Sequence, residues 1–534
     1  MLRVFIFLSL ISALLSAQIT LKEIKSKPTS RAKDFLIWQY LKQNITDKQA
    51  NEAYTLSSLH NKRVNWLYKK RSKNHFITYK QKCKKKRNLF NIKDQKCLEF
   101  ALNPYKTLVL SNTQRSKLSK KIKSISFKKL LKIQSEPYKV EAYRQYSADT
   151  ILKMFINTTA HHRRTNLNIE LDKKFINKLA SSKKIHYFIK MVMRDNKLTK
   201  LQKSLLKLDS KRLNSQDNFY LALFHLKHKK KKSAIKHLKM ALKKAKKSHT
   251  KDKINFWLYK ITQNKNYLRR ILKSTSINIY SLYAHDKMGV RVKNYFSKLI
   301  THHKNHKVDI TNPFEWDKLR KKIKKVPKRR LFSLAKKYQQ PNMLPVQSYI
   351  YEKAYDFKKH SYIMPYKKEL KGISKDEQAL VYAIMRQESN FIPSALSRSF
   401  ALGLMQMMPF LVDAMSKQAK EKITYQDMFK PKINLRYAVK HIEWIQKSLY
   451  HPLFIAYGYN GGVNYFRKHL KTGAFKKGKY EPFLSMELMY NVESREYGKK
   501  VLANYVMYKR ILGQKVSIIH LFQKLKYPKK NHRY

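Results

Sequence analysis

The stretch from Ser374 to Pro409 reads SKDEQALVYAIMRQESNFIPSALSRSFALGLMQMMP, and its pattern decides the fold of the C-terminal part of the chain. Ser374 followed three residues later by Glu377 forms a capping box, which predicts that a helix begins there. That helix must end before Pro393, because proline cannot continue it. The stretch is therefore predicted to form a helix, a loop and a second helix.

One carboxylate lies on the apolar face of the first predicted helix. Leu380, Ile384 and Glu388 recur every four residues and so share a face. Glu388 falls in the last turn, where apolar surroundings and the negative end of the helix dipole both disfavour the anion. We expect a raised pKa and a carboxylic acid that can donate a proton near neutral pH. The alternative is an ordinary solvated glutamate at a helix end.

The sequence around Glu388 resembles the catalytic domain of the soluble lytic murein transglycosylases, whose fold is similar to goose-type lysozyme. The blocks that carry the resemblance are RQESNF, a serine, GLMQMMP, DMFKPKINLR, GYNGG and ESR, and they cover the last part of the chain in the family's order. The resemblance implies a lysozyme-like catalytic domain over residues 371–534. It also implies cleavage of the MurNAc-GlcNAc bond of peptidoglycan.

A glycosidase usually needs two carboxylates, and here the second is missing from the motif. After Glu388 the next acidic residue is Asp413, beyond the GLMQ segment. A site with one carboxylate must take its nucleophile from the substrate, for example from the N-acetyl group of an amino sugar. By resemblance, Glu388 acts first as the acid and then as the base that lets the sugar's own O6 close a 1,6-anhydro ring.

Further site residues follow from the same resemblance. Ser397 matches a family serine near the N-acetyl group, and from the sequence alone it could equally be a polar loop residue. Gln406 and Met408 match residues that line the sugar subsites, on a helix expected to open at Gly403. Met408 could also belong to the core.

The GYNGG and ESR blocks supply supporting residues. Tyr459 matches a family tyrosine whose hydroxyl points at the catalytic acid, and Asn460 is expected to brace its loop. Glu493 matches a glutamate that hydrogen-bonds this tyrosine, with Arg495 as a neighbour. The alternative for Glu493 is a surface charge on a helix.

The composition is extremely basic. The 534 residues carry a formal net charge of +85, spread along the whole chain. Nucleic-acid binding, attraction to an anionic cell wall or membrane, and lysine enrichment at solvated positions would each give this charge, and we favour the last, with attraction to an anionic surface superimposed on it. No RNA-recognition module is found, so no nucleic-acid partner is expected.

Residues 1–17 have the form of a secretory signal. Arg3 precedes an apolar run that ends in Ser16 and Ala17, too short for a comfortable membrane span. We expect export to the periplasm after cleavage and no further membrane span, with an uncleaved anchor as the alternative. Peptidoglycan glycan strands are the expected partner, and we expect a monomer that could associate with envelope complexes.

Glycine and proline usage divides the chain. Only Gly289 precedes Gly372, and no proline lies between Pro137 and Pro313, which predicts helices joined by short turns. Phe219 to Lys246 reads as a helical hairpin, and such hairpins stack into superhelices. The expected architecture is mainly all-α. Its predicted domains are a U-shaped, ring-forming α-superhelical domain (18–311), a helical linker (312–370) and the catalytic domain (371–534).

Metal and cofactor chemistry find no support in the motifs. The sequence has no HExxH, GxSxG or phosphate-binding glycine loop, so no cofactor is expected. Cys83 and Cys97 could form a disulfide in an oxidising compartment or remain two buried thiols. The rival functions are a hydrolytic lysozyme on the same fold and a non-catalytic basic helical protein that binds RNA or murein.

Overall fold

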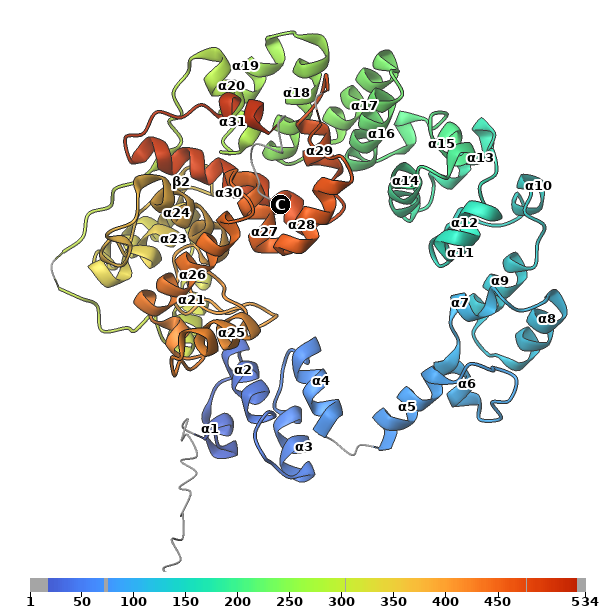
Figure 1. The fold of residues 1–534 in the computed structure, drawn as a ribbon, viewed down its shortest axis with the longest axis horizontal. Coiled ribbons are helices and arrows are strands. Elements are labelled where there is room, and N and C mark those ends of the chain that lie inside the picture. The colour runs from blue at the N-terminus through green and yellow to red at the C-terminus, as the bar shows by residue number, and fades with distance from the viewer. Residues whose placement is uncertain (1–17, 72–74, 303, 477, 526–534) are drawn as a thin grey trace, which may run out of the picture. The chain divides into compact units, whose positions relative to one another are not determined.

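The computed structural model describes residues 18–71, 75–302, 304–476 and 478–525 (Figure 1). The predicted signal segment, 1–17, lies outside the described residues. Within the described part the chain is mainly helical, with loops between the helices. Two short strands in this part, β1 (Tyr295–Phe296) and β2 (His360–Ser361), pair in parallel. None of the described helices is long and apolar enough to cross a membrane.

The chain divides into two compact units. The first unit takes residues from Met1–Lys73, Lys293–Ala474 and Met489–Tyr534, and the second takes Asn74–Val292 and Phe475–Leu488. Compact units group residues that contact one another and need not coincide with domains, so the predicted domain boundaries stay a prediction.

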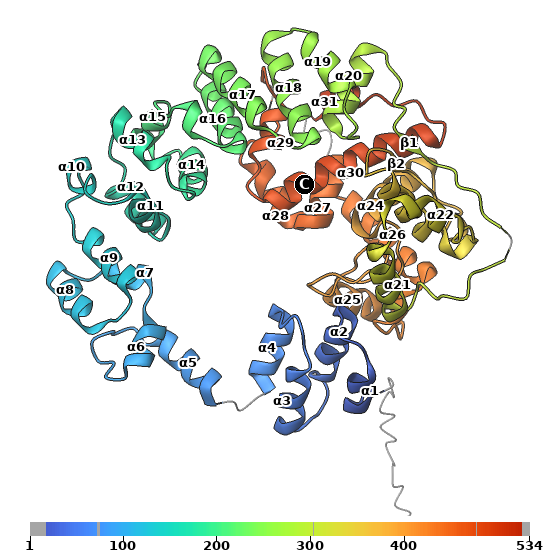
Figure 2. The ribbon, with the colours of Figure 1, turned by 180° about the vertical axis from the view of Figure 1, so that it is seen from behind.

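The second unit is an array of short helices (Figure 2). Its helices are α5 (His75–Lys85), α6 (Gln95–Ala101), α7 (Pro104–Thr107), α8 (Asn112–Lys121), α9 (Ile125–Gln134), α10 (Val140–Tyr143), α11 (Ala148–Ile156), α12 (Ala160–Thr165), α13 (Lys173–Leu179), α14 (Ile185–Arg194), α15 (Thr199–Leu205), α16 (Ser215–Lys227), α17 (Lys231–Lys244), α18 (Ser248–Thr262), α19 (Asn266–Leu272), α20 (Ile279–Met288) and α29 (Phe483–Leu488).

The hairpin predicted between Phe219 and Lys246 is confirmed as α16 and α17. Ala234, Leu238 and Ala241, expected on one face of the second helix, are all 0% exposed. Neighbouring hairpins therefore bury apolar faces that no single hairpin could bury alone.

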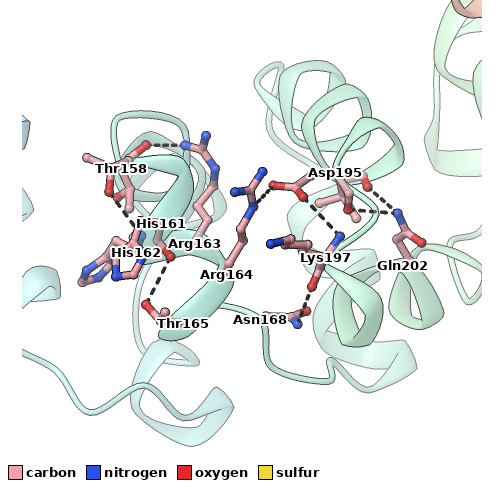
Figure 3. A network of polar contacts seen from close by, with 12 residues as sticks. Thr158, His161, His162, Arg163, Arg164, Thr165, Asn168, Asp195, Lys197 and Gln202 are labelled. Atoms are coloured by element: carbon pink, nitrogen blue, oxygen red, sulfur yellow. Dashed lines mark hydrogen bonds and ion pairs between the residues drawn. The ribbon is translucent and has the colours of Figure 1, made fainter. Parts of the chain in front are cut away.

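The run of two histidines and two arginines at 161–164 has structural partners in this array (Figure 3). Arg164 pairs with Asp195 at 2.8 Å, and Gln202 donates to the carbonyl of the same aspartate at 3.1 Å. Arg163 donates to main-chain carbonyls at the end of α11. These contacts join successive helices and give the run a role in the fold.

Cys83 and Cys97 are joined by a disulfide between α5 and α6, with their Cα atoms 5.1 Å apart. Both belong to a small apolar cluster with Leu89, Leu98 and Leu118. The bond closes a short loop in a small cluster, which limits the conformations of the unfolded chain.

The first unit holds the N-terminal helices and the motif-bearing segment. Its helices are α1 (Leu21–Ser26), α2 (Arg31–Tyr40), α3 (Asp47–Thr55), α4 (Lys62–Arg71), α21 (Pro313–Lys325), α22 (Leu331–Lys336), α23 (Leu344–Ala354), α24 (Lys375–Ser389), α25 (Pro409–Ala419), α26 (Pro431–Gln446), α27 (Pro452–Gly461), α28 (Val463–Lys471), α30 (Val492–Ile511) and α31 (Ile518–Lys524).

The core of the first unit forms where α24 and α27 both pack on α30. A Cβ added to Gly498 on α30 would lie 2.3 Å from the Tyr457 ring on α27, so glycine is what lets these helices approach closely. Arg386 ties α24 to β2 and α30, because its guanidinium donates to the Ser361 carbonyl at 2.6 Å and to Asn504 Oδ1 at 3.1 Å. This core fixes the end of α24 that carries Glu388.

The helix, loop and helix predicted from the opening motif are only partly as expected. Ser374 and Glu377 form the predicted capping box, and α24 begins and ends where the sequence indicates. The expectation that Gly403 opens a helix is wrong. Residues 401–408 form turns and isolated bridges, because Gly403 and Gln406 both have positive φ, and the next helix begins at Pro409.

Candidate active site

Glu388 lies in the last turn of α24 and is partly buried. Leu380 and Ile384, on the same face, are 3% and 0% exposed. Burial raises the pKa of Glu388 from 4.5 to about 7, against a hydrogen bond from Tyr497 that lowers it. The side chain therefore keeps a proton over much of the neutral range, as a general acid requires.

Tyr497 is the direct hydrogen-bond partner of the acid. Its hydroxyl donates to Glu388 Oε1 at 2.7 Å from α30, and the tyrosine is itself 6% exposed. Sequence reasoning missed this residue. A signal was present, because Tyr497 follows Glu493 by four residues and so shares its helix face.

Tyr459 makes a different contact from the expected one. Its hydroxyl donates to the Met405 carbonyl at 2.7 Å, and the bond to the acid comes from Tyr497 instead. Tyr459 still lies near enough to the acid to be affected by its charge. Burial is the larger cause of the raised pKa of Tyr459, and the negative charge of Glu388 raises it further. The carbonyl is an acceptor fixed by the turn at 403–406, and it holds the phenol in place.

Glu493 is exposed, and its main-chain N–H donates to Asn491 Oδ1 at the start of α30. Its negative charge contributes to the raised pKa of Glu388, so it lies near the acid. The neighbourhood thus holds a second carboxylate, which the motif around Glu388 did not indicate. Arg495 is buried and pairs with Glu496 at 2.9 Å.

Ser397 is part of a closed loop before the GLMQ turn. Its Oγ accepts main-chain N–H groups from Ser399 at 3.2 Å and Ala401 at 2.9 Å. Asn460 accepts a hydrogen bond from Ser494 at 2.7 Å, which ties the end of α27 to α30. The Ser397 side chain therefore fixes its local main chain, and the Asn460 side chain joins two helices.

Gln406 and Met408 are both partly exposed, whereas Met405 and Met407 are 0% and 1% exposed. The amide nitrogen of Gln406 donates to the carbonyls of Ala395 and Gly403, each at 2.9 Å. These two hydrogen bonds hold the turn in place, and the Gln406 side chain also lines a groove on the surface.

A groove of about 1110 Å³ runs between α25, α26 and the end of α27. Four of the sequence-predicted residues line it: Gln406, Met408, Tyr459 and Asn460. Glu388, Ser397 and Glu493 are not among its lining residues. The acid lies near the groove through Tyr459, which lines it and whose pKa is raised in part by the charge of Glu388.

The groove wall also presents aromatic rings. Trp444 on α26 is 55% exposed and Phe410 on α25 is 63% exposed. His441 stacks on Trp444 with ring centroids 5.7 Å apart, and burial lowers the pKa of His441 to about 4. The imidazole is thus neutral at neutral pH, and the wall combines flat apolar rings with amide groups.

No group of three or more histidine, cysteine, aspartate or glutamate side chains suited to a metal ion occurs in the part of the chain that the structure describes. The candidate site comprises Glu388 with its raised pKa, its hydrogen-bond partner Tyr497, the nearby carboxylate of Glu493 and the adjoining groove.

Comparison with protein families supports this description. Residues 366–481 match the family model for the transglycosylase SLT domain. This segment is similar to the transglycosylase SLT domain. It contains Glu388, Ser397, Gln406, Met408, Tyr459 and Asn460, while Glu493 and Tyr497 lie beyond the matched residues.

A curated relative matches over part of the chain. The chain is 33% identical over 137 residues to a Haemophilus influenzae protein provisionally named soluble lytic murein transglycosylase. The aligned part is 25% of this chain and 22% of the Haemophilus protein. The match therefore covers about a fifth of the length of that relative.

Solved structures share the fold over most of the chain. The 70-kDa soluble lytic transglycosylase SLT70 of Escherichia coli aligns with a TM-score of 0.53 and 15% identity, over 96% of this chain and 85% of SLT70. The complex of the 70-kDa soluble lytic transglycosylase with bulgecin A aligns with a TM-score of 0.52 and 15% identity, over 93% and 84%. The mainly helical, superhelical fold class inferred from the sequence is thereby confirmed. The match of residues 366–481 to the SLT domain model supports the resemblance.

Replacing Tyr497 with phenylalanine should move the pH profile of any reaction that uses Glu388 as an acid. Its hydroxyl stabilises the charged form of Glu388, so the pKa of the acid rises further in Tyr497→Phe. We expect the alkaline limb of kcat/KM to move up by about half to one pH unit. For the lytic transglycosylase activity that we propose, the measurement is kcat/KM against pH on soluble glycan chains.

The matched control is Tyr505→Phe on the same helix. The Tyr505 hydroxyl donates to Asp376 at 2.9 Å and does not touch Glu388. This variant should leave the pH profile where it is. Equal shifts in both variants would contradict a specific bond between Tyr497 and the acid.

Proposed function

We propose that the protein is a lytic transglycosylase that cleaves the β-1,4 bond between MurNAc and GlcNAc in peptidoglycan. The observation that carries the proposal is Glu388, a partly buried acid with a pKa of about 7 close to a groove of aromatic and amide side chains. The SLT domain match and the curated relative support the same activity.

The proposed reaction uses Glu388 twice. The protonated carboxyl gives its proton to the glycosidic oxygen as the bond to C1 breaks, while the N-acetyl oxygen of MurNAc supports the positive charge at C1. The resulting carboxylate then takes the proton of the C6 hydroxyl, whose oxygen bonds to C1. The products are a free GlcNAc hydroxyl and a 1,6-anhydroMurNAc end, and no water is consumed.

Tyr497 serves both halves of this cycle. Its hydroxyl holds Glu388 Oε1 in place while the carboxyl is protonated, and it stabilises the carboxylate after the proton has left. Ser397, Gln406, Met408, Tyr459 and Asn460 are proposed to hold the sugars or the loops that contact them.

The proposal includes the setting of the enzyme. We propose export to the periplasm, where peptidoglycan is the polymeric substrate, and action as a monomer with envelope complexes as candidate partners. The excess positive charge would attract the carboxylates of murein stem peptides, and added salt would weaken that attraction.

The second candidate is a hydrolytic lysozyme on the same fold, and the exposed carboxylate of Glu493 near the acid favours it as a base for water. The test is mass spectrometry of muropeptides released from purified sacculi. Anhydro ends are one water lighter than reducing ends, so the two outcomes differ in mass. We expect anhydro ends, and predominant reducing ends would overturn the proposal.

Glu493→Gln sharpens this test. Removing the charge of Glu493 lowers the pKa of Glu388, so the alkaline limb of the pH profile should move to lower pH. The product should remain anhydro, because O6 and not water is the nucleophile. Two results together would instead identify Glu493 as a hydrolytic base: Glu493→Gln releases no product, and the unmodified protein releases products with reducing ends.

A further inference from the structure

The loop that carries Ser397 is closed by its own main chain. Besides the two N–H groups that bond to its Oγ, the Ser397 N–H donates to the Ala401 carbonyl at 3.1 Å. The position of the serine hydroxyl is therefore fixed by the position of residues 396–401 as a group.

Two side chains from the N-terminal helices hold this group on either side of Ser397. Arg31, the first residue of α2, donates from Nη1 to the Leu396 carbonyl at 3.3 Å. Asn61, just before α4, donates from Nδ2 to the Arg398 carbonyl at 2.8 Å. The carbonyls of both neighbours of Ser397 thus accept hydrogen bonds from residues more than 300 positions earlier in the sequence.

An aromatic cluster anchors the same loop. Phe400 is 0% exposed and has a φ of 60°. Residues other than glycine rarely adopt this backbone conformation. Its ring lies 5.3 Å from that of Phe35 and 5.6 Å from that of Trp38, both on α2. Figures 1 and 2 both place α2 beside the segment that leads into α25.

We propose that α2 and the start of α4 position the Ser397 loop for the sugar, and that the hydrogen bond donated by Asn61 to the Arg398 carbonyl sets the position of this loop. This inference rests on the proposed function and goes beyond it, because it assigns a role in the site to the opposite end of the chain. Asn61 touches no substrate and is a positioning residue that acts through Ser397.

Asn61 allows a clean substitution. Its Oδ1 caps α4 by accepting the N–H groups of Arg63 and Val64, each at 2.9 Å, while only its Nδ2 reaches Arg398. Asn61→Asp keeps the cap, because aspartate is as good at this position. It also replaces the donor to Arg398 with a carboxylate oxygen that repels the carbonyl.

In Asn61→Asp we expect kcat/KM on soluble, peptide-free GlcNAc-MurNAc chains to fall about fivefold, mostly through a higher KM. The pH profile set by Glu388 should stay unchanged, and amide hydrogen exchange should become faster in a peptide containing Ser399 and Ala401. Asn61→Ser, which keeps a cap and a hydroxyl donor, should recover part of the loss.

Asn103→Asp is the matched control. Asn103 caps α7 by accepting the N–H of Tyr105 at 2.8 Å, so the substitution makes the same change of charge at a helix cap in the second unit. It should leave kcat/KM and exchange in the Ser397 loop unchanged. A fall equal to that of Asn61→Asp would show a general charge effect and overturn the inference.

A double-mutant cycle decides whether Asn61 acts through Ser397. If it does, adding Asn61→Asp to Ser397→Ala should lower kcat/KM little further. Additive losses, or an Asn61→Asp variant with normal KM and normal exchange, would overturn the inference. The failure of the proposed function is a separate result, because it would appear as full activity in Glu388→Gln whatever the exchange rates show.

Discussion

Glu388→Gln should lower kcat on purified sacculi at least about a thousandfold, because glutamine can neither give the proton to the leaving oxygen nor take one from O6. Sugar binding should largely remain, since the new side chain keeps the shape of glutamate and Tyr497 can still donate to its amide oxygen. The measurement is the rate of muropeptide release, together with glycan binding by calorimetry.

The same variant should be more stable than the unmodified protein, and only at higher pH. The pKa of Glu388 is raised to about 7 in the folded state from 4.5, so the folded protein binds the extra proton between these values. Stability is therefore lost as pH rises through this window. Glu388→Gln should gain about 1 to 3 kcal/mol above pH 7 and nothing below pH 4.5.

Glu377→Gln is the control for both effects. It makes the same substitution in the first turn of α24, where glutamine can still accept the N–H of Ser374 in the capping box. Its activity and the pH dependence of its unfolding should match those of the unmodified protein. Full kcat in Glu388→Gln would mean that another group is the proton donor. Glycan binding without muropeptide release in the unmodified protein would instead favour a non-catalytic binding protein, because such a protein needs no proton donor.

Gly403→Ala should lower the free energy of unfolding by about 4 kcal/mol, the largest stability loss that we expect from a single methyl group. Its φ is +74°, and an added Cβ would lie 2.1 Å from the Met428 carbonyl oxygen and 2.3 Å from Asn434 Nδ2. Asn434 is 0% exposed and bonds to the main chain of Leu402, Met405 and Met428, so it cannot move aside without leaving buried polar groups unpaired.

Gly372→Ala separates the two parts of that cost. Gly372 also has a positive φ, of +95°, but a Cβ there would meet no atom within 4 Å. Denaturant unfolding should show a loss of only about 1 to 2 kcal/mol for this variant. Equal losses at the two positions would mean that backbone strain, and not the contact with Met428 and Asn434, makes glycine necessary at 403.

The local patterns of the sequence predicted the elements well. The capping box at Ser374 and the apolar spacing that ends at Glu388 depend on neighbours within one helix, and the structure has both as expected. The buried face of α17 followed from spacing in the same way. Periodicity is a property of a short stretch, so a single sequence is enough to read it.

Contacts between distant segments were beyond such patterns. The donor to the acid is Tyr497 and not Tyr459, a choice that depends on the close packing of α27 against α30. The GLMQ segment looks helical by composition, yet it turns at Gly403 because the main chain must pass next to Asn434. Asn61 and Arg398 are 337 residues apart in the sequence, so no local pattern could predict that Asn61 contacts the Ser397 loop.

The membership of residues 475–488 in the second unit affects how the protein can be cut. Phe483 on α29 packs on Phe256 at 4.7 Å, and Tyr280 bonds to Glu487, so this loop of the C-terminal part completes the apolar interior of α18 and α20. A shortened protein that began at residue 371 would leave Phe483 without its aromatic neighbour and Phe400 without Trp38. Such a fragment should be poorly soluble, and its loss of activity would say little about catalysis.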